Sequence, residues 1–165
     1  MNLQHSTAMD GAERPTNSIG HVFSYLRNIL VKRLEPEPDV RLTVTNTTRN
    51  TVLATQLELA GTPEKRNKGL LGRKGLAPGS GLWIVPCESV HTFFMQFPID
   101  LVYLDRDNRV KKVRHAVGPW KLSACLSAHS ILELPAGVIR STGTQRGDTL
   151  ELVPDSTPAG DSTSQ

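Results

Sequence analysis

The stretch IDLVYLDRDNRVKKVRHAV, which runs from Ile99 to Val117, gives the clearest indication of the fold. Its first part alternates Ile99, Leu101 and Tyr103 with residues of the other parity, which is the period-two pattern of a β-strand. Apolar residues occur on both parities, so we expect this strand to lie centrally in a sheet. Residues 106–109 predict a turn, because Asp and Asn tolerate left-handed backbone geometry, and the rest of the stretch returns as the hairpin partner.

Other short strands are predicted on both sides of this hairpin. Residues 40–45 and 51–59 also alternate in polarity, and they predict a second hairpin with its turn at residues 46–50. Further short strands are expected at residues 82–86, 91–97, 130–134 and 149–153.

A helix is predicted from Pro63 to Leu71, because Thr62 is a suitable N-cap, proline is favoured at the first helical position, and Gly72 ends the segment. Residues 135–143 are expected to hold one helical turn. Many short strands and few helices predict an α+β, mainly β fold. We expect a compact antiparallel sheet or a partly closed barrel with one covering helix.

The two ends of the chain differ in composition from its centre. Residues 1–17 are polar, and residues 154–165 are rich in Ser, Thr, Pro and Gly, so both are predicted to be disordered. A single β-rich domain is expected at residues 39–153. Residues 18–35 carry the apolar stripe of an amphipathic helix, which we expect to pack on the domain or on a second copy of the chain. The alternative is peripheral contact with a membrane surface.

The composition is that of an ordinary globular protein. The 165 residues include 38% hydrophobic and 21% charged residues, and the net charge of +3 does not by itself indicate nucleic-acid binding. Cys87 and Cys125 are too few for a disulfide framework, so both are predicted to be buried free thiols. The sequence has no apolar run of about 18 residues and no secretory signal pattern at its start, and we therefore predict a cytoplasmic protein.

Several segments together carry a family resemblance. They are Lys65-Arg66-Asn67-Lys68-Gly69-Leu70-Leu71-Gly72-Arg73, Gly81-Leu82-Trp83-Ile84, His91-Thr92-Phe93-Phe94-Met95-Gln96-Phe97-Pro98-Ile99-Asp100, Leu132-Glu133-Leu134-Pro135-Ala136-Gly137 and Gly147-Asp148. In this order and spacing, over about residues 53–152, the chain resembles domain-of-unknown-function family 192 (DUF192). The family pattern is Arg-x-x-Gly-Leu, aromatic-x-Met, Pro-x-Asp, Glu-x-Pro-Ala-Gly and a final Gly-Asp. The resemblance implies a single β-rich α+β domain and supplies no reaction.

A polar ligand-binding cleft is the main site hypothesis. Arg66 and Arg73 lie seven residues apart and would share one face of the predicted helix, where two guanidinium groups can clamp a carboxylate or phosphate. Asp100 and Glu133 lie in apolar strands, where a carboxylate needs a partner. Together these four charges suggest one shared network, and we add His91 and Met95 to the walls of the candidate cleft. The alternative is a purely structural ion-pair cluster.

Catalytic and metal sites are weaker hypotheses. Cys87 and His91 are candidates for a nucleophile and its base, with Asp100 to orient them, although a buried thiol beside a hydrogen-bonded histidine is favoured. The available metal-ligating residues show no motif spacing, so neither a metal nor a cofactor is expected. The residues that this search considered are His91, Asp100, His115, His129 and Glu133.

The sequence favours a non-catalytic binding or accessory module whose cleft accepts a small anionic or polar ligand or a peptide. The alternatives are a small hydrolase or transferase that uses Cys87 or His91, and a partner-docking protein that acts through the helix at residues 18–34. The sequence does not define the ligand, the protein partner or the oligomeric state.

Overall fold

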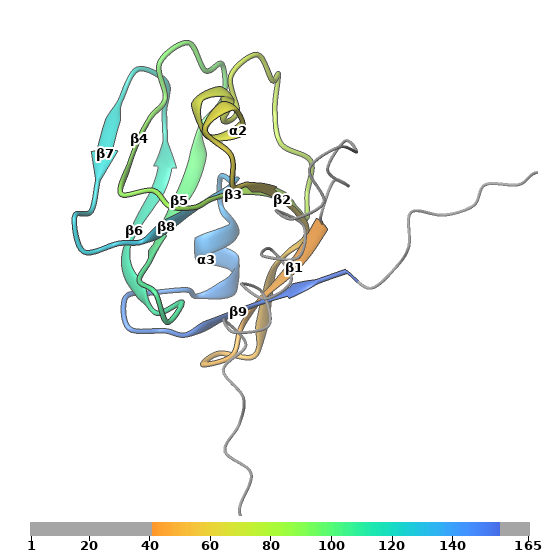
Figure 1. Ribbon diagram of the computed structural model, residues 1–165. Coiled ribbons are helices and arrows are strands. Elements are labelled where there is room, and N and C mark those ends of the chain that lie inside the picture. Colours follow the sequence, from red (N-terminus) through yellow and green to blue (C-terminus); the bar gives the residue numbers. More distant parts are fainter. Residues whose placement is uncertain (1–40, 156–165) are drawn as a thin grey trace, which may run out of the picture.

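The computed structural model describes residues 41–155, which form a mainly β structure with short helices (Figure 1). Along the chain, the elements are β1 (Arg41–Asn46), β2 (Thr51–Ala60), α2 (Pro63–Lys68), β3 (Ser80–Ile84), β4 (Ser89–His91), β5 (Ile99–Leu104), β6 (Val110–Val117), β7 (Leu122–Ala124), β8 (Ser130–Pro135), α3 (Val138–Thr142) and β9 (Leu150–Pro154). The predicted amphipathic helix at 18–35, the predicted disordered end at 1–17 and residues 156–165 of the predicted tail lie outside the described residues.

Seven of the described strands form one sheet in the order β6-β5-β8-β3-β2-β1-β9, and this sheet curls into half of a barrel (Figure 1). The prediction of a mainly β fold with a partly closed barrel is therefore confirmed. The sheet is not wholly antiparallel, because β2 and β3 pair in parallel, with Gln56 beside Ser80 and Ala60 beside Ile84. A parallel pair needs a crossover connection instead of a hairpin, and here the crossover contains α2.

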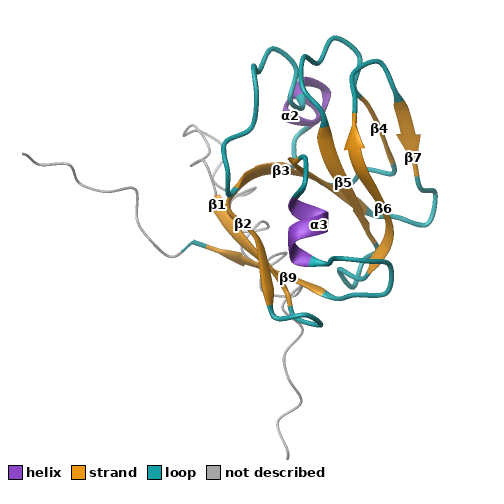
Figure 2. Ribbon diagram, turned by 180° about the vertical axis from the view of Figure 1, so that it is seen from behind, coloured by secondary structure: helices purple, strands orange, loops and turns teal. Residues whose placement is uncertain are grey.

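Strand β5 lies between β6 and β8, and all of its residues are buried, as predicted for a central strand. Val102 faces a core that includes Ile139 of α3, which lies in the hollow of the curled sheet (Figure 2). Leu101 faces a second core, which includes Leu70 after α2 and Val90 of β4. Strand β4 pairs with β7 in a separate two-stranded ribbon. Each face of the central strand therefore contributes to a different core.

Helix α2 begins as predicted and ends earlier than predicted. The Thr62 side chain accepts a hydrogen bond from the Lys65 N–H, and Pro63 occupies the first turn. The helix stops at Lys68 because Gly69 takes a φ of 49° and donates its N–H to the Lys65 carbonyl. Arg73 consequently lies beyond the helix, and the prediction that Arg66 and Arg73 share one helix face is wrong.

The strand predicted at residues 91–97 is wrong after His91, where β4 ends. Phe94 has a φ of 64°, which is left-handed and incompatible with a strand. Thr92, which is 1% exposed, holds this loop against the loop before β7. Its hydroxyl donates to the Gly118 carbonyl at 2.8 Å, and its N–H donates to the Lys121 carbonyl at 2.9 Å. These tertiary hydrogen bonds override the β propensity of the aromatic run.

Candidate functional site

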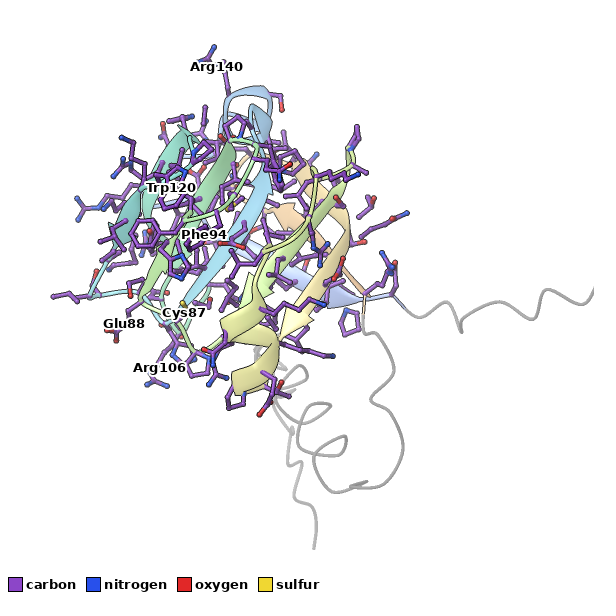
Figure 3. The ribbon with its side chains drawn as sticks, turned by 90° about the horizontal axis from the view of Figure 1, so that it is seen from above. Cys87, Glu88, Phe94, Arg106, Trp120 and Arg140 are labelled. Atoms are coloured by element: carbon purple, nitrogen blue, oxygen red, sulfur yellow. The ribbon has the colours of Figure 1, made fainter. Side chains whose placement is uncertain are left out.

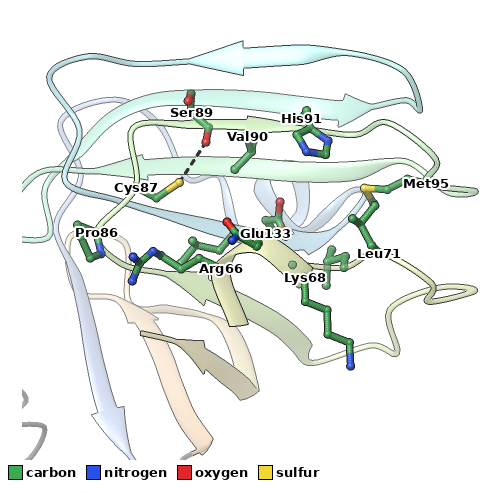
Figure 4. A pocket seen from close by; sticks show the side chains of 14 residues that line it. Arg66, Lys68, Leu71, Pro86, Cys87, Ser89, Val90, His91, Met95 and Glu133 are labelled. Carbon is green, nitrogen blue, oxygen red and sulfur yellow. Dashed lines mark hydrogen bonds between the residues drawn. The ribbon is translucent and has the colours of Figure 1, made fainter. Parts of the chain in front are cut away.

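A pocket of about 280 Å³ lies between α2, the β4 strand and the central sheet (Figure 4). Segments far apart in the sequence meet in its walls, including Arg66, Leu71, Cys87, His91, Met95 and Glu133. Four of the predicted cleft residues are therefore brought together, namely Arg66, His91, Met95 and Glu133. The volume is at the small end of the range for ligand sites, so it suits a small molecule or one end of a longer ligand.

Glu133 is the acidic side chain of the pocket. It projects from β8, where it is paired with Leu82 of β3 and Leu101 of β5, and it is 3% exposed. No described group forms a hydrogen bond with its Oε2 atom. Burial raises the pKa of Glu133 to about 7, although the positive charge of Arg73 acts in the opposite direction. Near neutral pH the carboxyl is thus about half protonated, and it can donate or accept a hydrogen bond.

Arg66 supplies positive charge to the wall of the same pocket. Its Nη1 donates to the Gly61 carbonyl at 2.6 Å, which holds the side chain along the pocket wall. Within residues 41–155, no acid forms an ion pair with the Arg66 guanidinium. Figure 4 shows Arg66 alongside the pocket and the Lys68 side chain directed away from it. The pocket therefore combines a guanidinium, whose charge also acts on the exposed Glu64, with a partly protonated acid, and the charge of its lining residues is net positive.

Cys87 and His91 both line the pocket without forming the predicted nucleophile and base pair. The Cys87 thiol donates to the Ser89 carbonyl at 3.1 Å (Figure 4). Burial raises the pKa of Cys87, so the thiol stays protonated at neutral pH and is a poor nucleophile. His91 is exposed and stacks on Phe93 with ring centroids 5.0 Å apart, and no hydrogen bond joins it to Cys87. This geometry does not favour covalent catalysis.

Arg73 lies outside the pocket, in an ion pair with Glu58 of β2. Its Nη1 and Nη2 atoms donate to the two carboxylate oxygens of Glu58 at 2.8 and 2.7 Å. The Arg73 hydrogen bonds lower the pKa of Glu58 and stabilise its ionised form. This pair joins the segment after α2 to the sheet, so Arg73 has a structural partner that the sequence did not suggest.

Asp100 also lies outside the pocket, on the other face of the sheet. It is paired with Leu134, whereas its neighbour Leu101 is paired with Glu133, so the two acids project to opposite sides. The carboxylate of Asp100 is fully buried and accepts three backbone N–H groups, from Ala116 at 2.7 Å, Gly137 at 3.0 Å and Ile139 at 2.8 Å. Asp100 therefore fastens the start of α3, and it does not share a network with Glu133.

An exposed aromatic cluster, formed by Phe93, Phe94 and Trp120, adjoins the pocket through His91. Phe94 and Trp120 are 70% and 59% exposed, and their rings meet edge to face at 4.7 Å (Figure 3). Trp120 has a φ of 61°, and its N–H donates to the Thr92 carbonyl at 2.9 Å. The cleft predicted from the sequence did not include Phe93, Phe94 or Trp120.

Residues 41–155 contain neither a cluster of candidate metal ligands nor a helix suited to span a membrane. Within this range, no three His, Cys, Asp or Glu side chains gather in an arrangement that would hold a metal ion. No helix in the described part of the chain has the length and apolar character needed to cross a membrane.

Residues 44–152 match DUF192, which is described as "Uncharacterized ACR". The chain belongs to this family. Its similar relatives include the UPF0127 protein of Thermococcus kodakarensis, which is 31% identical over 117 residues, covering 67% of this chain and 73% of that protein. The UPF0127 protein of Thermococcus gammatolerans is 31% identical over 113 residues, covering 65% and 72% of the two chains. The DUF192 resemblance seen in the sequence is therefore confirmed.

Two solved structures share the fold of this DUF192 chain. A "putative transcription regulator" from Sinorhizobium meliloti has a TM-score of 0.60 and 24% identity, covering 68% of this chain and 92% of its own. A protein of unknown function from Novosphingobium aromaticivorans has a TM-score of 0.59 and 24% identity, covering 68% of this chain and 84% of its own. At this level of identity the likeness concerns the fold alone.

The structure divides the DUF192 motif residues into two groups. Arg66, Met95 and Glu133, from three separate motif segments, line the pocket. Asp100 and Asp148, from the Pro-x-Asp and Gly-Asp segments, are buried acids with several hydrogen-bond donors; Asp148 accepts from Arg49, Asn46 and the Gln145 N–H. Part of the motif therefore fastens the fold, and another part surrounds an open cavity.

Proposed function

We propose that this DUF192 protein is a non-catalytic binding module, and that its pocket takes a small anionic or polar ligand or one end of a peptide. The observation that carries the proposal is the buried Glu133 carboxyl, whose Oε2 has no hydrogen-bond partner among residues 41–155 while the residue lines a cavity of about 280 Å³. A buried polar group without a partner is costly, and a ligand that bonds to it removes that cost.

The positive field and the neighbouring surface support a polar ligand. Arg66 keeps donor groups that the Gly61 carbonyl does not use, and a guanidinium with no ion-pair partner is a suitable contact for an anion. The exposed rings of Phe94 and Trp120 provide apolar contact area next to the pocket mouth. Exposed aromatic residues held in a fixed arrangement are typical of binding surfaces.

A ligand screen by thermal shift on the full-length chain tests the proposal. Compounds that raise the melting temperature are then measured against Arg66→Gln and against Arg106→Gln, which removes an equally basic but exposed side chain in a turn outside the pocket. We expect at least a tenfold loss of affinity in Arg66→Gln and none in Arg106→Gln. Unchanged affinity in both Arg66→Gln and Glu133→Gln would show that the binding site lies elsewhere.

The aromatic cluster is tested separately with Phe94→Ala and Trp120→Ala. Val52→Ala is the matched control, because Val52 is another exposed apolar side chain, 53% accessible, on β2. A peptide that enters the pocket and lies across the cluster should lose affinity in the aromatic variants alone. A ligand confined to the pocket should bind all three variants equally.

A further inference from the structure

The chemistry around Glu133 narrows the ligand class. We propose that the pocket binds a small carboxylate, which pairs with Arg66 and shares a proton with the Glu133 carboxyl, so that binding is accompanied by proton uptake. This inference rests on the proposed function, because it names the ligand of the same pocket.

The ligand must balance the charge of the side chains that line the pocket. Arg66 on α2, Cys87 after β3 and His91 on β4 line the pocket together with Glu133. The positive charge of Arg73 acts on Glu133 from outside the pocket, and Lys68 is directed away from it. Glu133 is the acid among the residues that line the pocket. The Arg66 guanidinium has no ion-pair partner within the described range. An anion is favoured by this field, whereas an ammonium group would be repelled by Arg66.

The ligand must also satisfy the hydrogen bonding of the Glu133 carboxyl. The Oε2 atom of Glu133 is buried and has no partner in the described part of the chain. A ligand atom that reaches it must therefore accept from a protonated carboxyl or donate to an ionised one. Two carboxyl groups that share a site hold one proton between them, because both cannot be ionised at close range. A carboxylate ligand therefore satisfies the buried oxygen of Glu133 by keeping that residue protonated.

The rest of the pocket wall is apolar, and the small size of the pocket limits the ligand. Met95 is 6% exposed and lines the cavity beside Val90 and Leu71, which together form an apolar surface. The pocket is small, so a carboxylate on a short aliphatic or aromatic chain suits it better than a nucleotide or a polyanion. The same wall accepts the last side chain of a peptide whose terminal carboxylate enters the pocket.

Three small probes of matched size test the inference: propionate, propionamide and propylammonium. Each is titrated into the full-length protein from pH 6 to pH 9, and binding is followed through the NMR shifts of the Val90 and Met95 amides. We expect propionate to bind, with an affinity that falls about tenfold per pH unit above pH 7 because ionised Glu133 repels it. We expect propylammonium to bind at least tenfold more weakly than propionate at pH 7.

Variants at Glu133 and at His91 test which residue of the pocket carries the pH dependence. In Glu133→Gln the amide donates at every pH, so propionate affinity should become flat above pH 7, whereas His91→Gln should retain the fall. Propionate binding with the same pH dependence in Glu133→Gln, or tighter binding of propylammonium, overturns the inference and leaves the binding pocket in place. If none of the probes shifts the pocket amides, the carboxylate inference is overturned, and the ligand screen with Arg66→Gln then decides on the proposed function itself.

Discussion

Glu133 should make the protein less stable as the pH rises, and the structure sets the size of the effect. Its pKa is about 7 in the folded chain, against an ordinary value of 4.5. Well below pH 4.5 the carboxyl is protonated in both the folded and the unfolded state, so its ionisation does not change the free energy of unfolding. Between the two values the folded state holds a proton that the unfolded state has lost, so the free energy of unfolding falls by about 1.4 kcal/mol per pH unit. From pH 5 to pH 8 the total loss is about 2 to 3 kcal/mol.

Glu133→Gln removes this loss, because glutamine does not ionise. The amide contacts of the variant add an offset to its free energy of unfolding, and that offset does not depend on pH. Urea unfolding of both proteins, followed by circular dichroism at pH 5, 6, 7 and 8, gives the difference in unfolding free energy at each pH. We expect the difference to rise by about 2 to 3 kcal/mol in favour of Glu133→Gln across this range. Glu88→Gln is the control, because Glu88 is an exposed acid near Cys87.

Curves for wild type and Glu133→Gln that stay parallel within about 0.5 kcal/mol from pH 5 to pH 8 would refute the reasoning. That result would mean that Glu133 ionises in the folded protein as easily as in water. The buried oxygen would then have a partner, and the premise of an unsatisfied carboxyl beside the cavity would be lost.

Three further predictions concern residues that the sequence assigned to the cleft or to a catalytic pair. Asp100→Asn should lower the unfolding free energy by about 2 to 4 kcal/mol in the urea assay, because its amide places a donor against backbone N–H groups. The control Asp107→Asn lies in an exposed turn and should leave the unfolding free energy unchanged. Arg73→Gln should lower the unfolding free energy by no more than about 1 kcal/mol in the urea assay, since the side chains of its pair with Glu58 are one third exposed. The sequence predicted buried thiols, whereas Cys87 and Cys125 are both half-buried. In a Cys125→Ser background, Cys87 should react with a thiol reagent at least tenfold more slowly in the native protein than in urea at pH 7.5. Equal rates would contradict a half-buried, protonated thiol.

The local sequence pattern was sufficient to predict most strands of the large sheet. The alternation at residues 99–105 predicted β5, because burial on both faces gives apolar residues on both parities. The start of α2 was predictable because Thr62 and Pro63 act on their own neighbours. The parallel pairing of β2 with β3 was not, because it depends on how the crossover packs and not on the strands themselves. The loop after His91 failed for a similar reason: the hydrogen bonds of Thr92 reach a segment about 26 residues away.

The candidate site was predicted in part. An acid in an apolar strand is visible in a sequence, so both Asp100 and Glu133 were identified as groups in need of an explanation. Their partners depend on register, since moving a strand pairing by one residue sends a side chain to the opposite face. Asp100 pairs with Leu134 and thereby faces α3, while Glu133 faces the pocket. Sequence alone therefore could not distinguish the structural acid from the one that borders a cavity.

The buried acids Asp100 and Asp148 differ from Glu133 in their hydrogen bonding, and this difference bears on why Glu133 is present. Asp100 and Asp148 are buried acids whose carboxylates receive three hydrogen bonds or more, so the fold itself accounts for them. Glu133 has an unpartnered oxygen and a raised pKa, and an apolar residue at its position would remove the energetic cost of the buried carboxyl. Its neighbours on the same face of β8 and β5, Ile131 and Leu101, are apolar and fully buried. Stability therefore does not explain this carboxyl, whereas the ligand proposed for the pocket would.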